Sequence, residues 1–317
     1  MSDGLRHTYA ALRAGRAPAG WVRLGGNERG ALWMLLAALG FTLNAAFAKT
    51  LAQGGMPVFQ IAFARAFFAL APLLPFLLAG GLVAFRTRHP GTHLLRALFG
   101  AGAMISGFYA LSTLPLATVT VLTFTVPLFA VVLSVLLLGE QVRWRRWTAT
   151  LTGFGGVVIM TLPSLLQDGG FVLEWALLAG LGQAFGIAMS VVLVKRVPAS
   201  ESQPVMVFWF CLASIILTAP LALMQWITPS QEQWILLAAV GVTGFVSQSL
   251  IIKAYRSGEA SFVAPFDYAK LPIAVLAGWL AFAELPDWAT YLGGAIVVGS
   301  TLYIARREAR PAEGSRF

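Results

Sequence analysis

The sequence predicts an all-α polytopic membrane protein whose ten transmembrane helices form two inverted five-helix repeats. Composition is the first reason for this fold class. The chain is 58% apolar and 11% charged, with 32 glycines and a mean hydropathy of +0.78, whereas an ordinary globular chain is about 25% charged. A soluble fold has too little interior for so much apolar sequence, so much of it must face lipid. A disulfide-stapled secreted protein is excluded, because Cys211 is the only cysteine in the sequence.

The apolar residues fall into ten stretches, which are the second reason. Each is close to the ~20 residues that cross a ~30 Å hydrocarbon core. Each should be a helix, because lipid offers no partners to unpaired backbone groups. The predicted spans are 30–52, 57–80, 94–112, 116–138, 147–163, 171–194, 204–224, 233–255, 260–283 and 287–305.

The distribution of the 22 lysines and arginines predicts the orientation of these spans. All but three precede the first span, follow the last, or lie around the even-numbered connections, whereas the odd-numbered connections hold acids such as Asp168 and Glu284. By the positive-inside rule, both termini lie in the cytoplasm and the number of spans is even. The net charge of +9 then reflects topology and attraction to an anionic lipid bilayer, with no nucleic-acid partner.

The two halves of the chain repeat each other, which is the third reason. Residues 33–40 and 175–182 share the pattern W-x-L-L-A-x-L-G, and later matches follow in the same order at an offset of 142 to 147. The last of them aligns Glu140 with Glu284, each four residues before a tryptophan. Five spans is an odd number, so the second half is inverted relative to the first, as in many secondary transporters.

Three segments resemble a known family. They are LGFTLNAAFAK at residues 39–49, the Pro57…Arg65 pattern of the second span, and the proline-bearing fourth span that ends in Leu-Gly-Glu140. These segments are similar to the drug/metabolite transporter (DMT) superfamily, EamA type, and the resemblance covers residues 30–305. It implies the EamA/DMT fold, with a central cavity between the repeats, and the transport of small metabolites, often outward.

The expected organisation is a basic cytoplasmic tail, two EamA-like repeats and a second cytoplasmic tail. The ranges are 1–29, 30–163, 171–305 and 306–317. The first span is too long for the h-region of a signal peptide, although the arginine-rich tail could be a transit peptide. We expect a multi-pass protein of the cell inner (plasma) membrane, as a monomer or homodimer. Arginine, alanine and glycine usage suits a GC-rich bacterium.

Charged residues inside spans are the first candidates for substrate binding. A charge at a helix centre costs ~2.5–3.5 kcal/mol, so such residues usually face a cavity or each other. Lys49 lies near the outer end of the first span, where it could contact substrate or snorkel to the interface. Arg65 lies roughly 12 Å from the outer surface. We expect Arg65 to bind substrate or act in gating, with a structural hydrogen-bonding role as the alternative.

The ninth span carries a second charged group between prolines, in the sequence PFDYAKLP at 265–272. Asp267 and Lys270 are three residues apart and share a helix face, next to the further candidate Tyr268. Prolines leave carbonyls unpaired, and interrupted helices often bind substrate in transporters. The two charges could simply neutralise each other, or the pair could open to receive a zwitterion. Asp267 is also the candidate for proton coupling.

The remaining candidates for substrate contact are uncharged. The amides lie at mid-depth, where each could equally join two helices. One tryptophan lies deeper than the interfacial aromatic belt, and one tyrosine matches Tyr255 in the repeat. These candidates are Asn44, Gln183, Gln248, Trp209 and Tyr109.

The sequence shows no sign of enzymatic chemistry. It has no GxxxxGK[ST] loop and therefore no ATP motor. His89 and His93 are four residues apart but lie in a basic connection, without partners for a metal site. No Ser/His/Asp set or pair of intramembrane carboxylates stands out. The sequence therefore predicts no catalytic residue, no cofactor and no metal.

The excess of cations inside the spans predicts a secondary, non-ATP transporter of a small anionic or zwitterionic organic solute, such as an amino acid or carboxylate. It would work by alternating access around a midplane cavity, and the resemblance favours export. One alternative is a multidrug exporter of lipophilic cations; the related small exporters place a glutamate in their first span, where this chain has Asn44 and Lys49. The other is a non-transporting membrane scaffold.

Overall fold

The computed structural model describes residues 25–73, 87, 89–139, 144–166, 175–194, 203–258 and 260–308. Most of these residues are helical, and no strand occurs among them. Most of the two predicted tails, together with Glu140 and Asp168, lie outside the described residues. Six of the described helices are long and apolar enough to cross a membrane, and two shorter apolar helices accompany them.

The helices follow the predicted order. The first repeat consists of α2 (Gly26–Gln53), α3 (Val58–Phe68) with the 3₁₀ turn η2 (Ala71–Leu73), α5 (Pro90–Thr113), α6 (Leu116–Thr123) with α7 (Val126–Leu138), and α8 (Trp144–Leu166). The second repeat consists of α9 (Trp175–Val194), α10 (Gln203–Met224), α11 (Gln231–Ser257), α12 (Ala260–Val263) with the 3₁₀ segment η5 (Ala264–Ala269) and α13 (Lys270–Phe282), and α14 (Trp288–Glu308).

One prediction about the second connection is wrong. The third span begins at Pro90, a favourable first residue of a helix because proline has no N–H to leave unpaired. His93 is therefore a fully buried residue of α5 and not part of a surface connection. Arg96, counted among the charges of that connection, also lies in α5, where its guanidinium donates to the Met206 carbonyl of α10 (2.5 Å).

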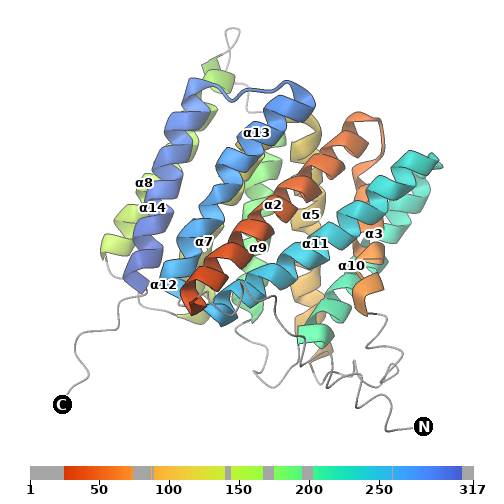
Figure 1. The fold of residues 1–317 in the computed structure, drawn as a ribbon, viewed down its shortest axis with the longest axis horizontal. Helices are drawn as coiled ribbons and strands as arrows, with labels where there is room; N and C mark the ends of the chain where they lie inside the picture. The colour runs from red at the N-terminus through yellow and green to blue at the C-terminus, as the bar shows by residue number, and fades with distance from the viewer. Residues whose placement is uncertain are drawn as a thin grey trace.

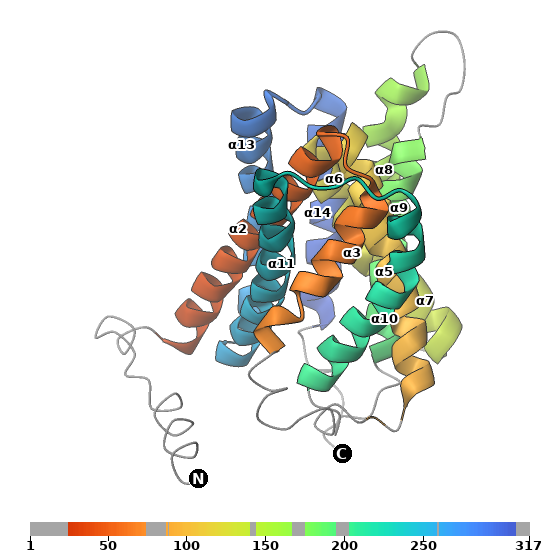
Figure 2. The same cartoon turned by 90° about the vertical axis from the view of Figure 1, so that its right-hand side faces the viewer.

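Each helix packs against helices of the other repeat. In Figure 1, α2 runs alongside α11, and α8 lies beside α14 at the far side of the bundle. The helix that corresponds to α2 in the second repeat is α9, and the helix that corresponds to α11 in the first repeat is α5. The pairs α2–α11 and α9–α5 are both in contact. The pairs α3–α10, α8–α14 and α6–α13 are each formed by two counterparts, and α3 and α10 are neighbours in Figure 2 as well. The arrangement is that of two inverted repeats.

Small residues let the paired helices approach closely. A Cβ on Gly40 of α2 would lie 2.3 Å from the Ser247 hydroxyl of α11, and Gly182 of α9 faces Ser106 of α5 in the equivalent place. At the crossing of α8 and α14, a Cβ on Gly156 or Gly293 would meet the other glycine's carbonyl oxygen at 2.8 or 2.4 Å. Close packing of small residues is the usual way for helices to associate in lipid.

The fourth helix of each repeat is interrupted. In the first repeat, α6 ends at Thr123 and α7 begins at Val126, just before Pro127, which has no N–H to donate to the preceding turn. The Thr301 hydroxyl of α14 lies 3.3 Å from the Phe124 carbonyl at this break. In the second repeat, the 3₁₀ segment η5 contains Pro265 and separates α12 from α13.

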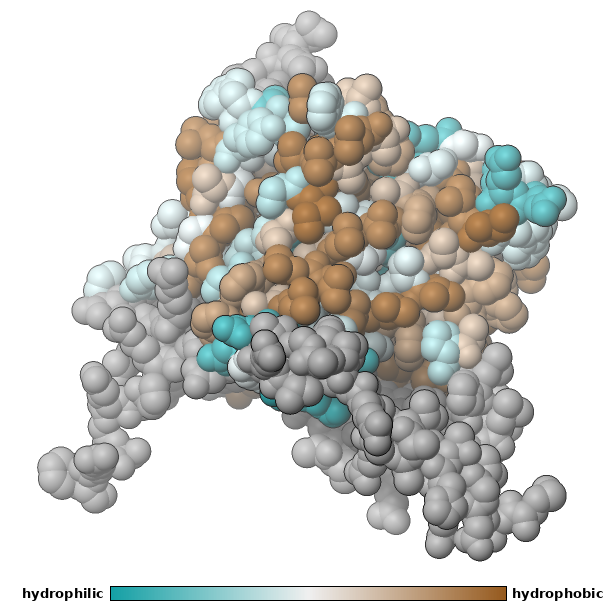
Figure 3. Space-filling model, viewed as in Figure 1, coloured by the Kyte–Doolittle hydropathy of each residue, from teal (hydrophilic) through white to brown (hydrophobic). Residues whose placement is uncertain are grey.

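Apolar side chains cover the middle of the molecular surface. Figure 3 shows a broad hydrophobic area across the face formed by α2 and α11, with hydrophilic residues gathered toward the ends. Large apolar residues are widely exposed on several helices, for example Leu136 (72%) and Trp175 (76%). Such continuous apolar exposure marks a surface that contacts lipid. The bundle therefore presents its sides to the bilayer.

Candidate substrate-binding site

Two polar side chains of the first repeat converge on α11 in the middle of the bundle. The Asn44 amide of α2 donates to the Val240 carbonyl (2.5 Å) and the Thr243 hydroxyl (3.2 Å), so it joins α2 to α11. A Cβ on Gly244 would lie 3.1 Å from Arg65 Nε and 3.3 Å from Asn44 Nδ2. Because Gly244 has no side chain, the guanidinium and the amide can both pack against it.

Arg65 has aromatic but no acidic neighbours in contact. Its guanidinium carbon lies 5.8 Å from the centre of the Phe108 ring. Among the residues that the structure describes, no carboxylate forms an ion pair with Arg65. A partly buried guanidinium that makes no ion pair with the described residues is a suitable partner for a carboxylate ligand.

The charged pair of the second repeat lies next to α2, the helix that carries Asn44. Lys270 Nζ lies 2.5 Å from Asp267 Oδ1, as the three-residue spacing predicts. The ammonium also lies 4.9 Å from the centre of the Phe41 ring of α2, one turn from Asn44. Lys270 therefore contacts α2 about one turn, or ~5 Å along the axis, from Asn44, the residue that packs on Gly244 together with Arg65.

Tyr268 lies at the point where the two interrupted helices meet. Its ring centre is 5.0 Å from that of Phe124, at the break between α6 and α7. Its hydroxyl interacts with the Thr301 side chain of α14. The two breaks are thus in contact, next to the Asp267–Lys270 pair.

The other uncharged candidates are dispersed. Gln183 packs on Gly107, and its Oε1 is buried without a hydrogen-bond partner among the described residues. Trp209 stacks on His93, 6.3 Å between ring centres, at the other side of α5. Tyr109 and Gln248 are exposed, the latter one turn beyond Gly244. Their contact with substrate stays a prediction.

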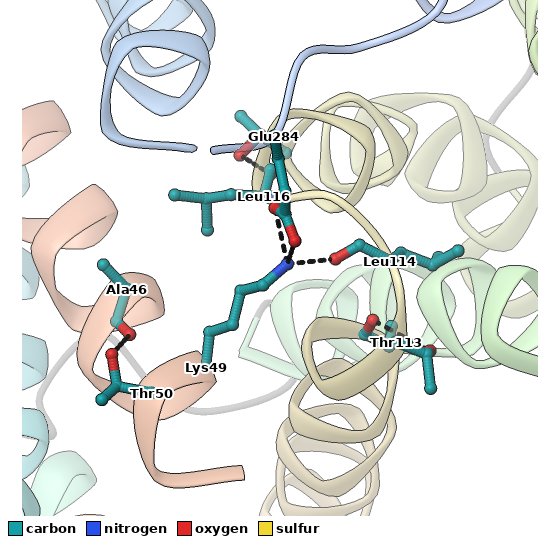
Figure 4. Close-up of polar contacts among 9 residues, drawn as sticks. Ala46, Lys49, Thr50, Thr113, Leu114, Leu116 and Glu284 are labelled. Atoms are coloured by element: carbon teal, nitrogen blue, oxygen red, sulfur yellow. Dashed lines mark hydrogen bonds and ion pairs between the residues drawn. The ribbon is translucent and has the colours of Figure 1, made fainter. Parts of the chain in front are cut away.

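Lys49 has a different environment from Arg65. Its side chain is fully buried and does not snorkel. Figure 4 shows it pointing toward two connections, where Nζ lies 2.7 Å from the Glu284 carboxylate and 2.7 Å from the Leu114 carbonyl. Sequence reasoning assigned Glu284 to a surface connection and missed this pair. The alignment of Glu284 with Glu140 marked the residue, but nothing in it indicated Lys49 as the partner.

The structure shows two hollows on its exterior, away from these residues. One, of about 410 Å³, lies between α13 and α14 and is lined by Pro272 and Trp279 among others; the second, of about 430 Å³, lies between α8 and α14. None of the candidate residues lines them. No group of three metal-ligating side chains gathers within the described residues.

Comparison with known proteins identifies the family. The profile of the EamA-like transporter family matches residues 28–162 and 174–306, one match for each half of the chain. The chain belongs to the EamA-like transporter family. The fold class inferred from the sequence, a DMT-type arrangement of two repeats, is confirmed by this membership together with the helical structure.

Individual relatives of this EamA-like chain are transporters of small metabolites. The riboflavin transporter of Vibrio cholerae is 37% identical over 91% of this chain and 96% of its own. The S-adenosylmethionine uptake transporter of Rickettsia prowazekii is 33% identical over 88% and 93%. The pseudopaline exporter CntI of Pseudomonas aeruginosa is 28% identical over 88% and 96%. A solved crystal structure, 24% identical, matches 86% of the chain with a TM-score of 0.55 and shows the fold alone.

Proposed function

We propose that this EamA-like protein is a secondary transporter of a small organic metabolite that bears a carboxylate, anionic or zwitterionic. The observation that carries the proposal is Arg65, a guanidinium beside the Asn44 amide in the middle of the bundle with no carboxylate on it among the described residues. A charge at such a depth is costly unless a partner neutralises it. A substrate carboxylate is the partner that fits the donor fork of a guanidinium.

The Asp267–Lys270 pair supplies the second half of the proposed site. Lys270 lies over Phe41 of α2, about one turn from Asn44, and Asp267 is paired with it. When the pair opens, Lys270 can take a substrate carboxylate and Asp267 a cationic group. A zwitterion would therefore exchange one ion pair for two, with its carboxylate placed between the two cations Lys270 and Arg65.

The named relatives support a metabolite with these groups. S-adenosylmethionine ends in a zwitterionic amino acid, and the relatives named for its uptake match this chain at 32–33% identity. The Vibrio cholerae relative at 37% is named for riboflavin, which has no carboxylate, so riboflavin is the alternative substrate that the screen must separate from this proposal. Relatives named as uptake transporters match at higher identity than the exporter at 28%. We therefore propose uptake, where the sequence alone had favoured export.

The proposed setting is a bacterial inner membrane with both termini in the cytoplasm. The charge distribution of the connections supports this orientation. It follows that the end of the bundle where α2 finishes, with Leu114 and Glu284, faces outward. We refer to it as the outer end.

A binding screen followed by transport tests the proposal. Purified protein is first melted with S-adenosylmethionine, riboflavin, amino acids and dicarboxylates, because a ligand that binds the folded state raises its apparent stability. Proteoliposomes are then assayed for uptake of each radiolabelled hit. Arg65→Gln should lose uptake, whereas the matched control Arg256→Gln, an exposed arginine in the last turn of α11, should retain it. Uptake by Arg65→Gln at the native rate would refute the role of Arg65.

A further inference from the structure

A single ion pair joins three segments at the outer end of the bundle. Lys49, near the end of α2, contacts Glu284 in the α13–α14 connection and donates to the Leu114 carbonyl. The Glu284 carboxylate also accepts from the Leu116 N–H at the start of α6, at 3.3 Å. The pair therefore fastens the first helix of one repeat to the last connection of the other (Figure 4).

Lys49 and Glu284 are largely shielded from water, so separating the two charges costs free energy. The Lys49 side chain is 0% exposed, and Nζ lies 5.2 Å from the centre of the Phe282 ring. Glu284 is 23% exposed, so water reaches the pair from the carboxylate side. Separating two buried partners leaves each charge uncompensated until water enters. An opening of the outer end must therefore hydrate both groups.

The backbone before Glu284 is held in an unfavourable conformation. Ala283 has φ of 54°, in the left-handed region, which costs roughly 1–2 kcal/mol for a residue with a Cβ. Its N–H bonds to the Trp279 carbonyl, and the Glu284 N–H bonds to that of Gly278 (3.0 Å), which closes the end of α13. At the matching position after α7, the chain has Gly139 with φ of 67°. The strained turn directs Glu284 toward Lys49.

The position in the second repeat that corresponds to Lys49 holds no lysine. Glu140 is the residue of the first repeat that corresponds to Glu284. The residue of the second repeat that corresponds to Lys49 is Val191, at the repeat offset of 142. Val191 carries no charge and is 53% exposed. Lys49 therefore has no charged counterpart at the repeat-related position.

We propose that the Lys49–Glu284 ion pair is the outer gate of the transporter. It closes the outer end in the conformation described, and it must separate before Asn44 and Arg65 become reachable from outside. The inference rests on the transport function proposed above, but its test needs no substrate.

Thiol labelling in intact cells tests the gate. A reporter cysteine replaces Thr243, which contacts Asn44, in a Cys211→Ser background, and a membrane-impermeant maleimide is added from outside. Lys49→Met and Glu284→Gln should each raise the labelling rate about tenfold. The double variant should label no faster than either single variant, because both remove the same interaction. The matched control is Asp287→Asn, an acid that caps α14 through Thr290 N–H; it should label at the background rate.

A second reporter distinguishes an open gate from an unfolded protein. Met160→Cys is buried at the α8–α14 crossing and should stay unlabelled when only the gate opens. Labelling of this site in the gate variants would show that the pair holds the fold, and would overturn the proposal. An unchanged rate at Thr243→Cys in both variants, or a rise confined to inside-out vesicles, would overturn it too. If the gate variants label as expected but the native protein takes up none of the screened solutes, the result would count against the proposed function and not against the gate.

Discussion

Arg65 and Lys270 approach α2 from opposite repeats. Arg65 lies beside Asn44, and Lys270 lies over Phe41 one turn away. Asp267 neutralises Lys270, while Arg65 has no acidic contact among the described residues. The two cations are thus unequal: one is available to an anion at once, and the other only after an ion pair opens.

Arg65→Gln and Lys270→Gln should each weaken solute binding, by about 1–3 kcal/mol for a lost charged hydrogen bond. Their effects should be non-additive, as for residues that share a partner. Isothermal titration of the purified variants with the solute found in the screen measures both quantities. Unchanged affinity in the two variants would mean that these charges serve the structure and not the ligand.

Ala283→Gly should stabilise the folded protein by about 0.5–1 kcal/mol, because glycine adopts the left-handed conformation without the Cβ clash. The matched control is Ala277→Gly in the middle of α13, which should destabilise by about 1 kcal/mol. Thermal unfolding in detergent compares the two. If Ala283→Gly melts below the native protein, the turn is not strained.

At the residue scale, the sequence predicts which side chains carry charge in the bilayer but not all of their partners. The Asp267–Lys270 pair is local, so a three-residue spacing is enough to predict it. Lys49 and Glu284 are 235 residues apart, and their contact depends on how the second repeat folds over the first. His93 seemed exposed because helix α5 begins earlier than its hydrophobic pattern.

The crossing of α8 and α14 depends on two glycines. Gly156→Val should destabilise the protein by about 1–3 kcal/mol, because its Cβ would meet the Gly293 carbonyl and Ile296. Gly155→Val is the matched control, since nothing lies within 4 Å of a Cβ there. Melting temperatures of both variants in the same detergent provide the measurement. An equal loss of melting temperature in the two variants would show that helix propensity, and not close packing at the crossing, determines the destabilisation.

The interrupted ninth span places Asp267 where a moving helix could separate it from Lys270. Asp267→Asn should abolish the dependence of uptake on a pH gradient while leaving counterflow exchange of the solute intact, because an amide cannot carry a proton. Proteoliposome uptake with and without an imposed gradient measures this. Gradient-driven uptake that survives in Asp267→Asn would place the coupling elsewhere or make transport facilitative.

At the element scale, one of the two breaks follows from the sequence alone. Prolines at both ends of 265–272 predict the irregular η5 segment. Pro127 is a single proline and would be compatible with a mildly kinked helix. The gap between α6 and α7 also involves Thr301 of α14, whose hydroxyl bonds to the Val297 carbonyl of its own helix (2.8 Å) and lies 3.3 Å from the Phe124 carbonyl, a contact between residues 177 apart in the sequence.

The orientation of the whole molecule can be tested with reporter fusions. Fusions after Gly55 and Asp168 should read as outside, and fusions after His89 and Arg146 as inside, because arginines gather at the even-numbered connections. Alkaline phosphatase and fluorescent-protein reporters measure the two sides. A reversed pattern would put Lys49 and Glu284 at the cytoplasmic end and remove the basis of the outer gate.

The pairing of helices across the repeats has a consequence for synthesis. α2, α3, α5 and α8 find their main partners in α11, α10, α9 and α14, all of which the ribosome makes later. When the first five helices have entered the bilayer, the nascent chain has few of its final contacts. The N-terminal half must wait, inserted but unassembled, until the C-terminal half arrives. Truncated products should therefore be removed by membrane proteases, and we expect neither half, although each is a complete repeat, to fold stably alone.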